Sequence, residues 1–88
     1  MVDETYLTQY GLMAEKHWRE FRPAMVRGME ANGTLRGALF EAQETTIGEI
    51  EMLTRQLETQ QKLTPQQAHD RAWEMIREKY ILLPPEER

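Results

Sequence analysis

Two histidines are the side chains of this chain best suited to acid–base chemistry. His17 and Glu20 stand three residues apart in a helical region, a spacing that could ligate a metal ion or hold a proton-transfer pair. His69 directly precedes Asp70. Because a zinc site needs about four ligands, or three and a water, neither pair is sufficient alone. We therefore expect both histidines to make only local hydrogen bonds.

The composition removes the usual catalytic nucleophiles. The chain has no cysteine and no serine, which excludes thiol catalysis, thiolate zinc sites and serine-hydrolase elbows. It also lacks a glycine-rich phosphate loop. We therefore expect a protein that is not an enzyme and that carries no metal or other cofactor.

A basic–aromatic cluster is the first candidate binding surface. Its members Trp18, Arg19, Arg22 and Arg27 lie on both sides of the Arg22-Pro23 pair. Arginine beside aromatic rings is typical of nucleic-acid contacts and equally of protein interfaces. A net charge of −4 favours a protein partner over nucleic acid. Neighbouring glutamates dilute the cluster, so an ordinary solvated face is favoured over either kind of contact.

An acidic stripe is the second candidate surface. It runs along the predicted third helix, is interrupted by Arg55, and consists of Glu41, Glu44, Glu51 and Glu58. Such a stripe could imitate phosphates and occupy the nucleic-acid groove of a partner enzyme. Most stripes of this kind are solvated helix faces.

Local signals divide the chain into four segments. Asp3 can begin the first, and Pro23 disfavours helical geometry at Arg22. Asn32-Gly33 can end a helix in left-handed geometry, after which Thr34 can cap the next. The strongest signal is Thr64-Pro65-Gln66-Gln67, a capping box with proline at the first helical position.

Apolar residues recur every three or four positions within these segments, which predicts helices and no strands. The predicted helices span 4–21, 23–31, 35–61 and 65–80. We therefore expect an all-α fold, a small bundle of three to four helices with one long third helix.

The predicted third helix is long for so small a protein. At 1.5 Å per residue it extends about 40 Å, whereas a compact chain of this length is roughly 30 Å across. Either Gly48 kinks the helix or another chain covers its free end. Because small cores are often completed by oligomerisation, we expect a homo-oligomer, most simply a dimer.

The chain length of 88 residues bounds the remaining organisation. We expect one helical domain over 1–83 and a short solvated tail over 84–88. The apolar motif Ile81-Leu82-Leu83-Pro84-Pro85 leaves the last predicted helix. It could dock on a partner, but folding back over the bundle is the more economical expectation. The sequence shows neither a signal peptide nor an apolar run long enough to span a membrane, so a cytoplasmic protein without membrane contact is expected.

Several short motifs together resemble the TnpV-like proteins of transposons. The motifs are Gly11, Trp18-Arg19-Glu20-Phe21-Arg22-Pro23, Met25, Asn32-Gly33-Thr34-Leu35, Leu39, Leu63-Thr64-Pro65 and Ala72-Trp73. The segment from Ala72 to Pro84 is also similar to small phage and mobile-element proteins. The chain departs from the family at Met25, where the family has tyrosine, and in lacking its N-terminal extension. The resemblance implies a small helical accessory protein with no catalytic residues to carry over.

These observations favour a non-catalytic helical interaction protein of a mobile element or phage, acting through a protein-binding surface. Two alternatives remain, an inhibitor of a nucleic-acid enzyme through the acidic stripe and a weak nucleic-acid binder through the basic–aromatic cluster. An enzyme is the least favoured class.

Overall fold

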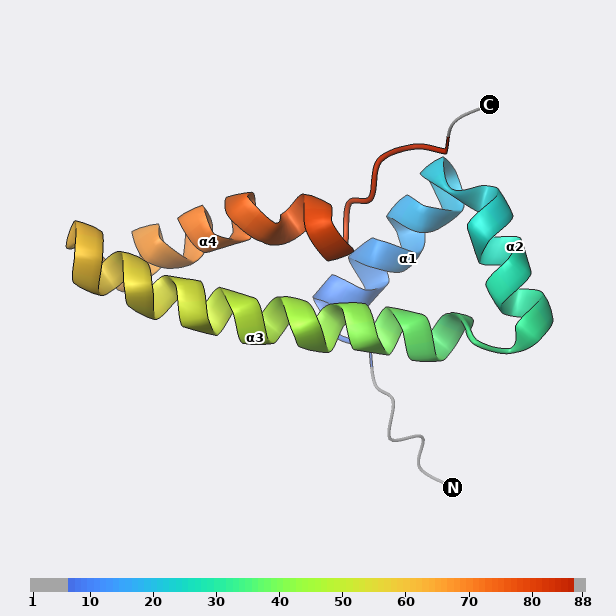
Figure 1. The fold of residues 1–88 in the computed structure, drawn as a ribbon, viewed down its shortest axis with the longest axis horizontal. Helices are drawn as coiled ribbons and strands as arrows, with labels where there is room; N and C mark the ends of the chain where they lie inside the picture. The colour runs from blue at the N-terminus through green and yellow to red at the C-terminus, as the bar shows by residue number, and fades with distance from the viewer. Residues whose placement is uncertain (1–6, 87–88) are drawn as a thin grey trace, which may run out of the picture.

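Four helices follow one another along the chain in the computed structural model, which describes residues 7–86 (Figure 1). They are α1 (Gln9–Phe21), α2 (Pro23–Asn32), α3 (Leu35–Gln61) and α4 (Pro65–Tyr80). No strand occurs among the described residues. The all-α prediction with a long third helix is confirmed.

The first helix begins later than predicted. Leu7 and Thr8 are not helical, so the predicted start at residue 4 is wrong for these two positions; Asp3 lies outside the described residues. Thr8 is the N-cap, and its hydroxyl accepts a hydrogen bond from the backbone N–H of Tyr10 at 3.2 Å. This cap satisfies one of the free N–H groups at the helix start and fixes the boundary at Gln9.

The other boundaries agree closely with the predictions. Gly33 ends α2 in left-handed geometry, with a φ of 71° that a residue without Cβ adopts at little cost. Thr34 precedes α3, but its hydroxyl donates back to the carbonyl of Met29 instead of capping the helix. Thr64 and Gln67 form the predicted capping box at the start of α4.

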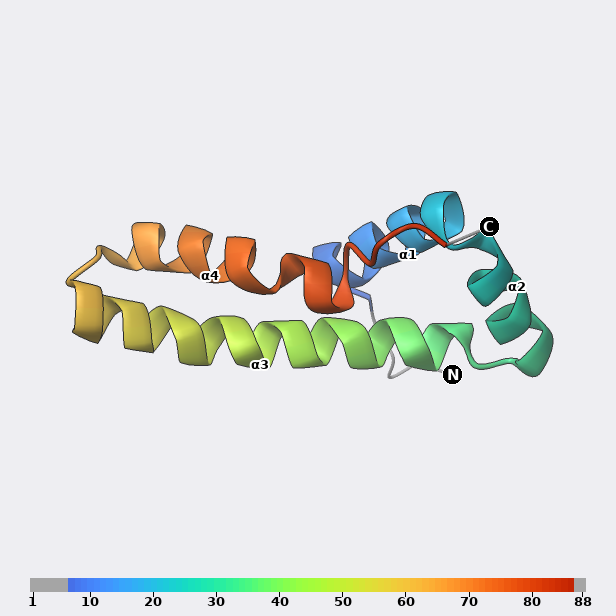
Figure 2. The ribbon, with the colours of Figure 1, turned by 45° about the horizontal axis from the view of Figure 1, so that its top comes forward.

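The third helix runs unbroken through Gly48, and the end that was expected to lack cover is covered by the same chain. The chain turns at Lys62 and returns as α4, which lies antiparallel along the C-terminal half of α3 (Figure 2). The molecule is flat, with extents of 46, 40 and 14 Å along its principal axes. No second chain is needed to cover α3.

The core consists of two apolar clusters, one along each half of α3. The first joins α1, α2 and the start of α3, and its buried members are Ala14, Trp18, Val26, Leu35, Leu39 and Ile81. The second lies between α3 and α4 and contains Ile50, Leu57, Ala68, Ala72 and Ile76. Tyr10 and Trp73 contact both clusters, with ring centroids 5.4 Å apart.

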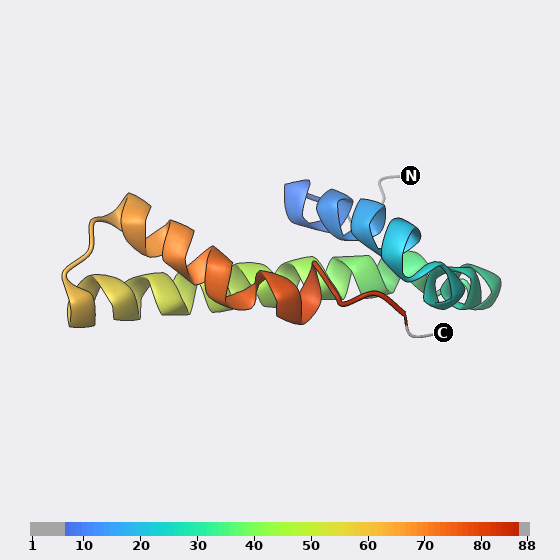
Figure 3. The same ribbon diagram turned by 90° about the horizontal axis from the view of Figure 1, so that it is seen from above.

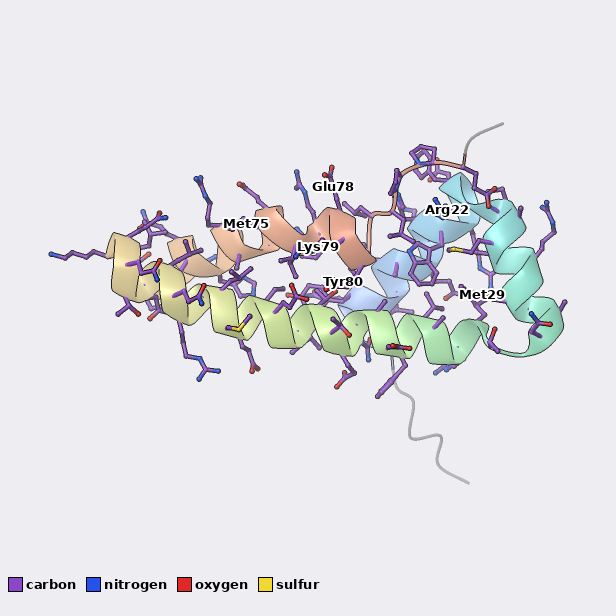
Figure 4. The ribbon with its side chains drawn as sticks, in the orientation of Figure 1. Arg22, Met29, Met75, Glu78, Lys79 and Tyr80 are labelled. Atoms are coloured by element: carbon purple, nitrogen blue, oxygen red, sulfur yellow. The ribbon has the colours of Figure 1, made fainter. Side chains whose placement is uncertain are left out.

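Two further contacts bind α4 to α3 near the middle of the molecule. The Tyr80 hydroxyl donates to the carboxylate of Glu49, which raises the pKa of Tyr80, and Lys79 lies 3.5 Å from the same carboxylate. Figure 4 shows Tyr80 directed toward α3 and Glu78 on the outer edge of α4. None of the described helices is both long and apolar enough to cross a membrane.

Candidate functional site

The C-terminal segment Ile81–Glu86, which we call the strap, leaves α4 and runs alongside α1 to the start of α2 (Figure 3). Its first residue is fully buried in the core, and Leu82 and Leu83 pack against the same cluster. The predicted fold-back of this apolar segment is confirmed. The indole N–H of Trp18 donates to the carbonyl of Ile81 at 2.9 Å.

Two more side chains of the α1 end reach carbonyl groups of the strap. Nε2 of His17 lies 2.7 Å from the carbonyl oxygen of Leu83, while its ring packs on Phe21 with 4.5 Å between the centroids. The guanidinium of Arg22 donates to the carbonyl of Pro84 at 2.8 Å. His17, Trp18 and Arg22 therefore hold the strap mainly through the carbonyl groups of the strap backbone.

Glu86 anchors the far end of the strap at the start of α2. Its carboxylate accepts backbone N–H bonds from Ala24 at 3.2 Å and Met25 at 2.9 Å, and its own N–H donates to the carbonyl of Phe21 at 3.0 Å. Because Arg22, the N-cap residue, supplies no side-chain cap, Glu86 caps this helix from a distance of 61 residues in the chain. Within the segment predicted as a solvated tail, Pro84 and Pro85 are exposed, whereas Glu86 is half-buried and bonded to the start of α2.

The environment of Glu86 lowers the pKa of its carboxyl group. The N–H of Met25 has the largest effect; the N–H of Ala24 and the positive charges of Arg22 and Arg27 add to it, and desolvation opposes them. A carboxyl group whose pKa is lower in the folded state stabilises the fold above its unfolded pKa. That stabilisation is lost as the pH falls through the folded value.

We therefore expect the strap to weaken in acid. In urea unfolding followed by circular dichroism, wild type should exceed Glu86→Gln in stability at pH 7, and the difference should shrink below the ordinary carboxyl value of 4.5. The other carboxyl groups titrate in both proteins, so their contributions to the stability cancel in the difference. A difference that stays constant from pH 7 to pH 3 would contradict the capping role.

The strap forms one wall of a groove of about 640 Å³, which we call the strap groove. It is lined by His17, Phe21, Glu78, Leu82, Leu83, Pro84 and Pro85. The Phe21 side chain in it is 38% exposed. The groove is therefore apolar, with one carboxylate and one imidazole as its polar groups.

The structure divides the basic–aromatic cluster among three roles. Trp18 is only 4% exposed and belongs to the core, and Arg22 holds the strap. Arg19 pairs with Glu15 at 2.9 Å and Glu30 at 3.1 Å, and these carboxylates raise its pKa.

Arg27 differs from the other members because it is exposed and no described residue pairs with it. It shares a small hollow of about 120 Å³ with Arg19 and Glu30. Trp18 and Arg22 bond to the strap, the charge of Arg27 acts on Glu86 at its far end, and Arg19 pairs with glutamates of α1 and α2. The four residues do not form one open surface.

The acidic stripe lies on α3 as two separate parts. Glu44, Glu51 and Glu58 are seven residues apart, so they share one line along the helix, and the first two are exposed while Glu58 is half-buried. Glu41 points about 60° away from Glu44 around the helix and lines a different hollow, of about 270 Å³, together with Lys79.

The expectation that both histidines make only local hydrogen bonds is wrong for His17, whose ring nitrogen meets a carbonyl group 66 residues away in the chain. His17 is taken up by the strap and Phe21, and exposed His69 lies 4.0 Å from Asp70. Within residues 7–86, no three side chains of the kinds that bind metals are grouped closely enough to hold an ion.

Sequence reasoning missed two residues that matter here. Glu86 was assigned to the tail, although a carboxylate after a proline pair is free to reach a helix start. Gln43 occupies a position of the apolar repeat on α3 and is 1% exposed, and its Oε1 accepts bonds from the N–H and hydroxyl of Thr8 at 2.6 and 3.1 Å. A polar residue in register with Leu39 and Ile50 is the signal that could have found it.

The fold and the site define a small all-α protein in which α1 and α2 bind the chain's own C-terminal strap. Comparisons with protein-family models, curated proteins and solved structures each return no match to this chain. The resemblance to TnpV-like proteins therefore stays a prediction from short motifs.

Proposed function

We propose that this chain is a non-catalytic interaction protein that binds a protein partner through the strap groove. The single observation that carries the proposal is the groove itself, an apolar hollow with a partly exposed aromatic ring. Its volume falls within the roughly 300–1,000 Å³ typical of binding pockets. The proposed setting, an accessory role in a mobile element or phage, is supported by the motif resemblance alone.

The lining of the strap groove suits a protein side chain. Aromatic and aliphatic groups in a desolvated pocket dominate binding energy at protein interfaces, and polar groups surround them. Here Phe21 and the strap prolines supply the apolar floor and walls, and Glu78 supplies a charge at the edge. A partner segment carrying a large apolar side chain fits this arrangement.

The internal roles of the basic–aromatic cluster favour a protein partner over nucleic acid. Nucleic-acid affinity depends on several cations free to meet phosphates and on rings free to stack. Trp18 is buried, Arg22 donates to the strap, and Arg19 is shared between two glutamates. Arg27 alone is a weak basis for such binding.

The groove proposal predicts that one surface substitution abolishes partner binding and a matched one does not. Phe21→Glu places a carboxylate in the strap groove, whereas Leu12→Glu places one on α1 at a side chain 56% exposed and outside the groove lining. Proteins captured from extracts of the native host by wild type should be lost with Phe21→Glu and kept with Leu12→Glu. Capture that is unchanged by Phe21→Glu would contradict the proposal.

A charge-reversal control separates this function from the inhibitor alternative. Lysine at Glu44, Glu51 and Glu58 reverses the aligned part of the acidic stripe while leaving the strap groove untouched. We expect capture to survive this change. Capture that depends on the three glutamates and not on Phe21 would instead support a role for the acidic stripe.

We include self-association in the proposal, with a second copy as one such partner. Phe21, Met52 and Met75 leave large apolar side chains partly exposed, and burial of such area favours association. Light scattering should give a mass above that of a monomer at high micromolar concentration, and Phe21→Glu should restore the monomer. A strict monomer under these conditions would remove self-association from the proposal and leave the groove to other partners.

A further inference from the structure

The surface beneath the strap has the properties of a peptide-binding site that already holds a ligand. Three side-chain nitrogens, from His17, Trp18 and Arg22, meet the carbonyl oxygens of strap residues over distances of 2.7 to 2.9 Å. The contacts of His17 and Arg22 depend on the path of the backbone, so other extended segments can make them too, whereas Trp18 stays bonded to the buried Ile81. We call this surface on α1 and the first turn of α2 the strap site.

The strap itself specifies which segments fit the strap site. Pro84 and Pro85 have no backbone N–H, so the strap needs no acceptor at these two positions. The carboxylate one residue further lies on the free N–H groups of Ala24 and Met25, where the dipole of α2 also favours negative charge. A segment with an apolar residue, a proline pair and then an acidic residue therefore matches the groups that the strap site presents.

We propose that the strap site binds an extended partner segment of the type apolar–apolar–Pro–Pro–acidic, and that the chain's own strap occupies the site as a resident competitor. Binding of the partner segment displaces Leu82 to Glu86. Because these residues form a wall of the strap groove, displacement also dismantles the groove. The inference rests on the proposed function in one respect. A segment that displaces the strap also removes a wall of the strap groove, and so prevents the binding proposed there.

Competition with the tethered strap lowers the affinity that the chain shows for a free peptide. A tethered ligand has an effective concentration in the millimolar range, so the wild-type chain should bind a free peptide weakly. Glu86→Ala removes the carboxylate contacts of the resident strap and should strengthen peptide binding by about fivefold or more. The site that receives the peptide is unchanged in this variant.

The experiment uses the full chain and a fluorescent peptide of the sequence Tyr80 to Arg88. Anisotropy titrations compare wild type with the Glu86→Ala chain, each with the native peptide and with a peptide carrying alanine in place of Glu86. We expect the native peptide to bind the variant chain best and the alanine peptide to bind either chain at least several-fold more weakly than the native peptide. Equal binding of both peptides, or none at millimolar concentration, would overturn the inference.

A second measurement tests displacement directly. Since the chain has no cysteine, Pro85→Cys places a single spin label on the strap. Added peptide should increase the mobility of that label, and binding without such an increase would show a different site and refute exchange. Failure of the groove proposal has a different signature, unchanged partner capture by Phe21→Glu, so the two failures are distinguishable.

Discussion

Replacing Gly11 with alanine should lower the free energy of unfolding by about 1–2 kcal/mol, because the helix gains propensity but loses its fit to α3. A Cβ at this position would lie 2.5 Å from Oε1 of Gln43 and 2.8 Å from Cδ2 of Leu7. Both distances are shorter than real Cβ contacts allow, so these side chains must move. Gln43 cannot move without giving up its two bonds to Thr8.

The cost at Gly11 comes from the buried polar contact more than from lost space. Gln43 is almost fully buried, so an oxygen separated from Thr8 would have no water to replace the lost donors. The crossing of α1 over α3 depends on this contact, since Thr8 is also the N-cap of α1. Loosening it should therefore weaken the start of α1 as well.

Two other glycines provide matched controls for Gly11→Ala. At Gly28 in α2 and Gly48 in α3, an added Cβ meets nothing within 4 Å. Alanine there should stabilise the protein by about 0.5–1 kcal/mol through helix propensity alone. Urea unfolding by circular dichroism gives all three values, and a Gly11→Ala variant as stable as Gly48→Ala would contradict the close approach of α1 to α3.

Replacing Trp18 with alanine should have the largest effect of any single change considered, a loss of about 3–5 kcal/mol. The side chain is 4% exposed at the centre of the first cluster, where α1, α2, α3 and the strap meet. A domain of this size has a total stability of roughly 4–13 kcal/mol. With a total stability at the lower end of this range, the variant is expected to be largely unfolded.

Trp18→Phe separates packing from the hydrogen bond to the strap. Phenylalanine retains most of the apolar contact but leaves the carbonyl of Ile81 without its donor, which should cost about 1–3 kcal/mol. Trp73→Phe is the control, because that indole packs on Tyr10 at the junction of the two clusters and is half-buried. It should cost less than Trp18→Phe in the same urea series.

The outcome at Trp18 also bears on the binding prediction. Trp18 and Arg22 were expected to contact a partner, and in the structure both contact the chain's own strap. If Trp18→Phe weakens partner capture only in proportion to its loss of stability, the residue acts through the fold. Loss of capture at full stability would instead indicate direct contact.

Most of the secondary structure could be predicted from the sequence because its causes are local. The capping box at Thr64 and Gln67 and the left-handed turn at Gly33 are short patterns whose geometry depends on a few neighbouring residues. The start of α1 was misplaced because the threonine cap at Thr8 competes with a longer run free of proline. Periodicity indicates which face of a helix is buried but not where a weak boundary falls.

The candidate site could be predicted only in part. The fold-back of Ile81 to Leu83 follows from hydrophobicity, since an apolar segment leaving a helix gains by covering the core. Which polar groups meet that segment does not follow. The arginines and the tryptophan near Pro23 have the same identities whether they face a partner, solvent or another part of the chain.

The sequence by itself determined an all-α chain with a long third helix, the chief turns between helices, and the absence of cysteine and serine chemistry. Only the tertiary structure decided that α4 covers the exposed half of α3, that Glu86 caps α2, and that Gly11 admits Gln43 against the backbone of α1. The physical reason is the range of the contacts. Capping and periodicity act over a few residues, whereas the contacts of Glu86 and Gln43 join groups more than 30 residues apart through backbone N–H groups, which every residue except proline carries.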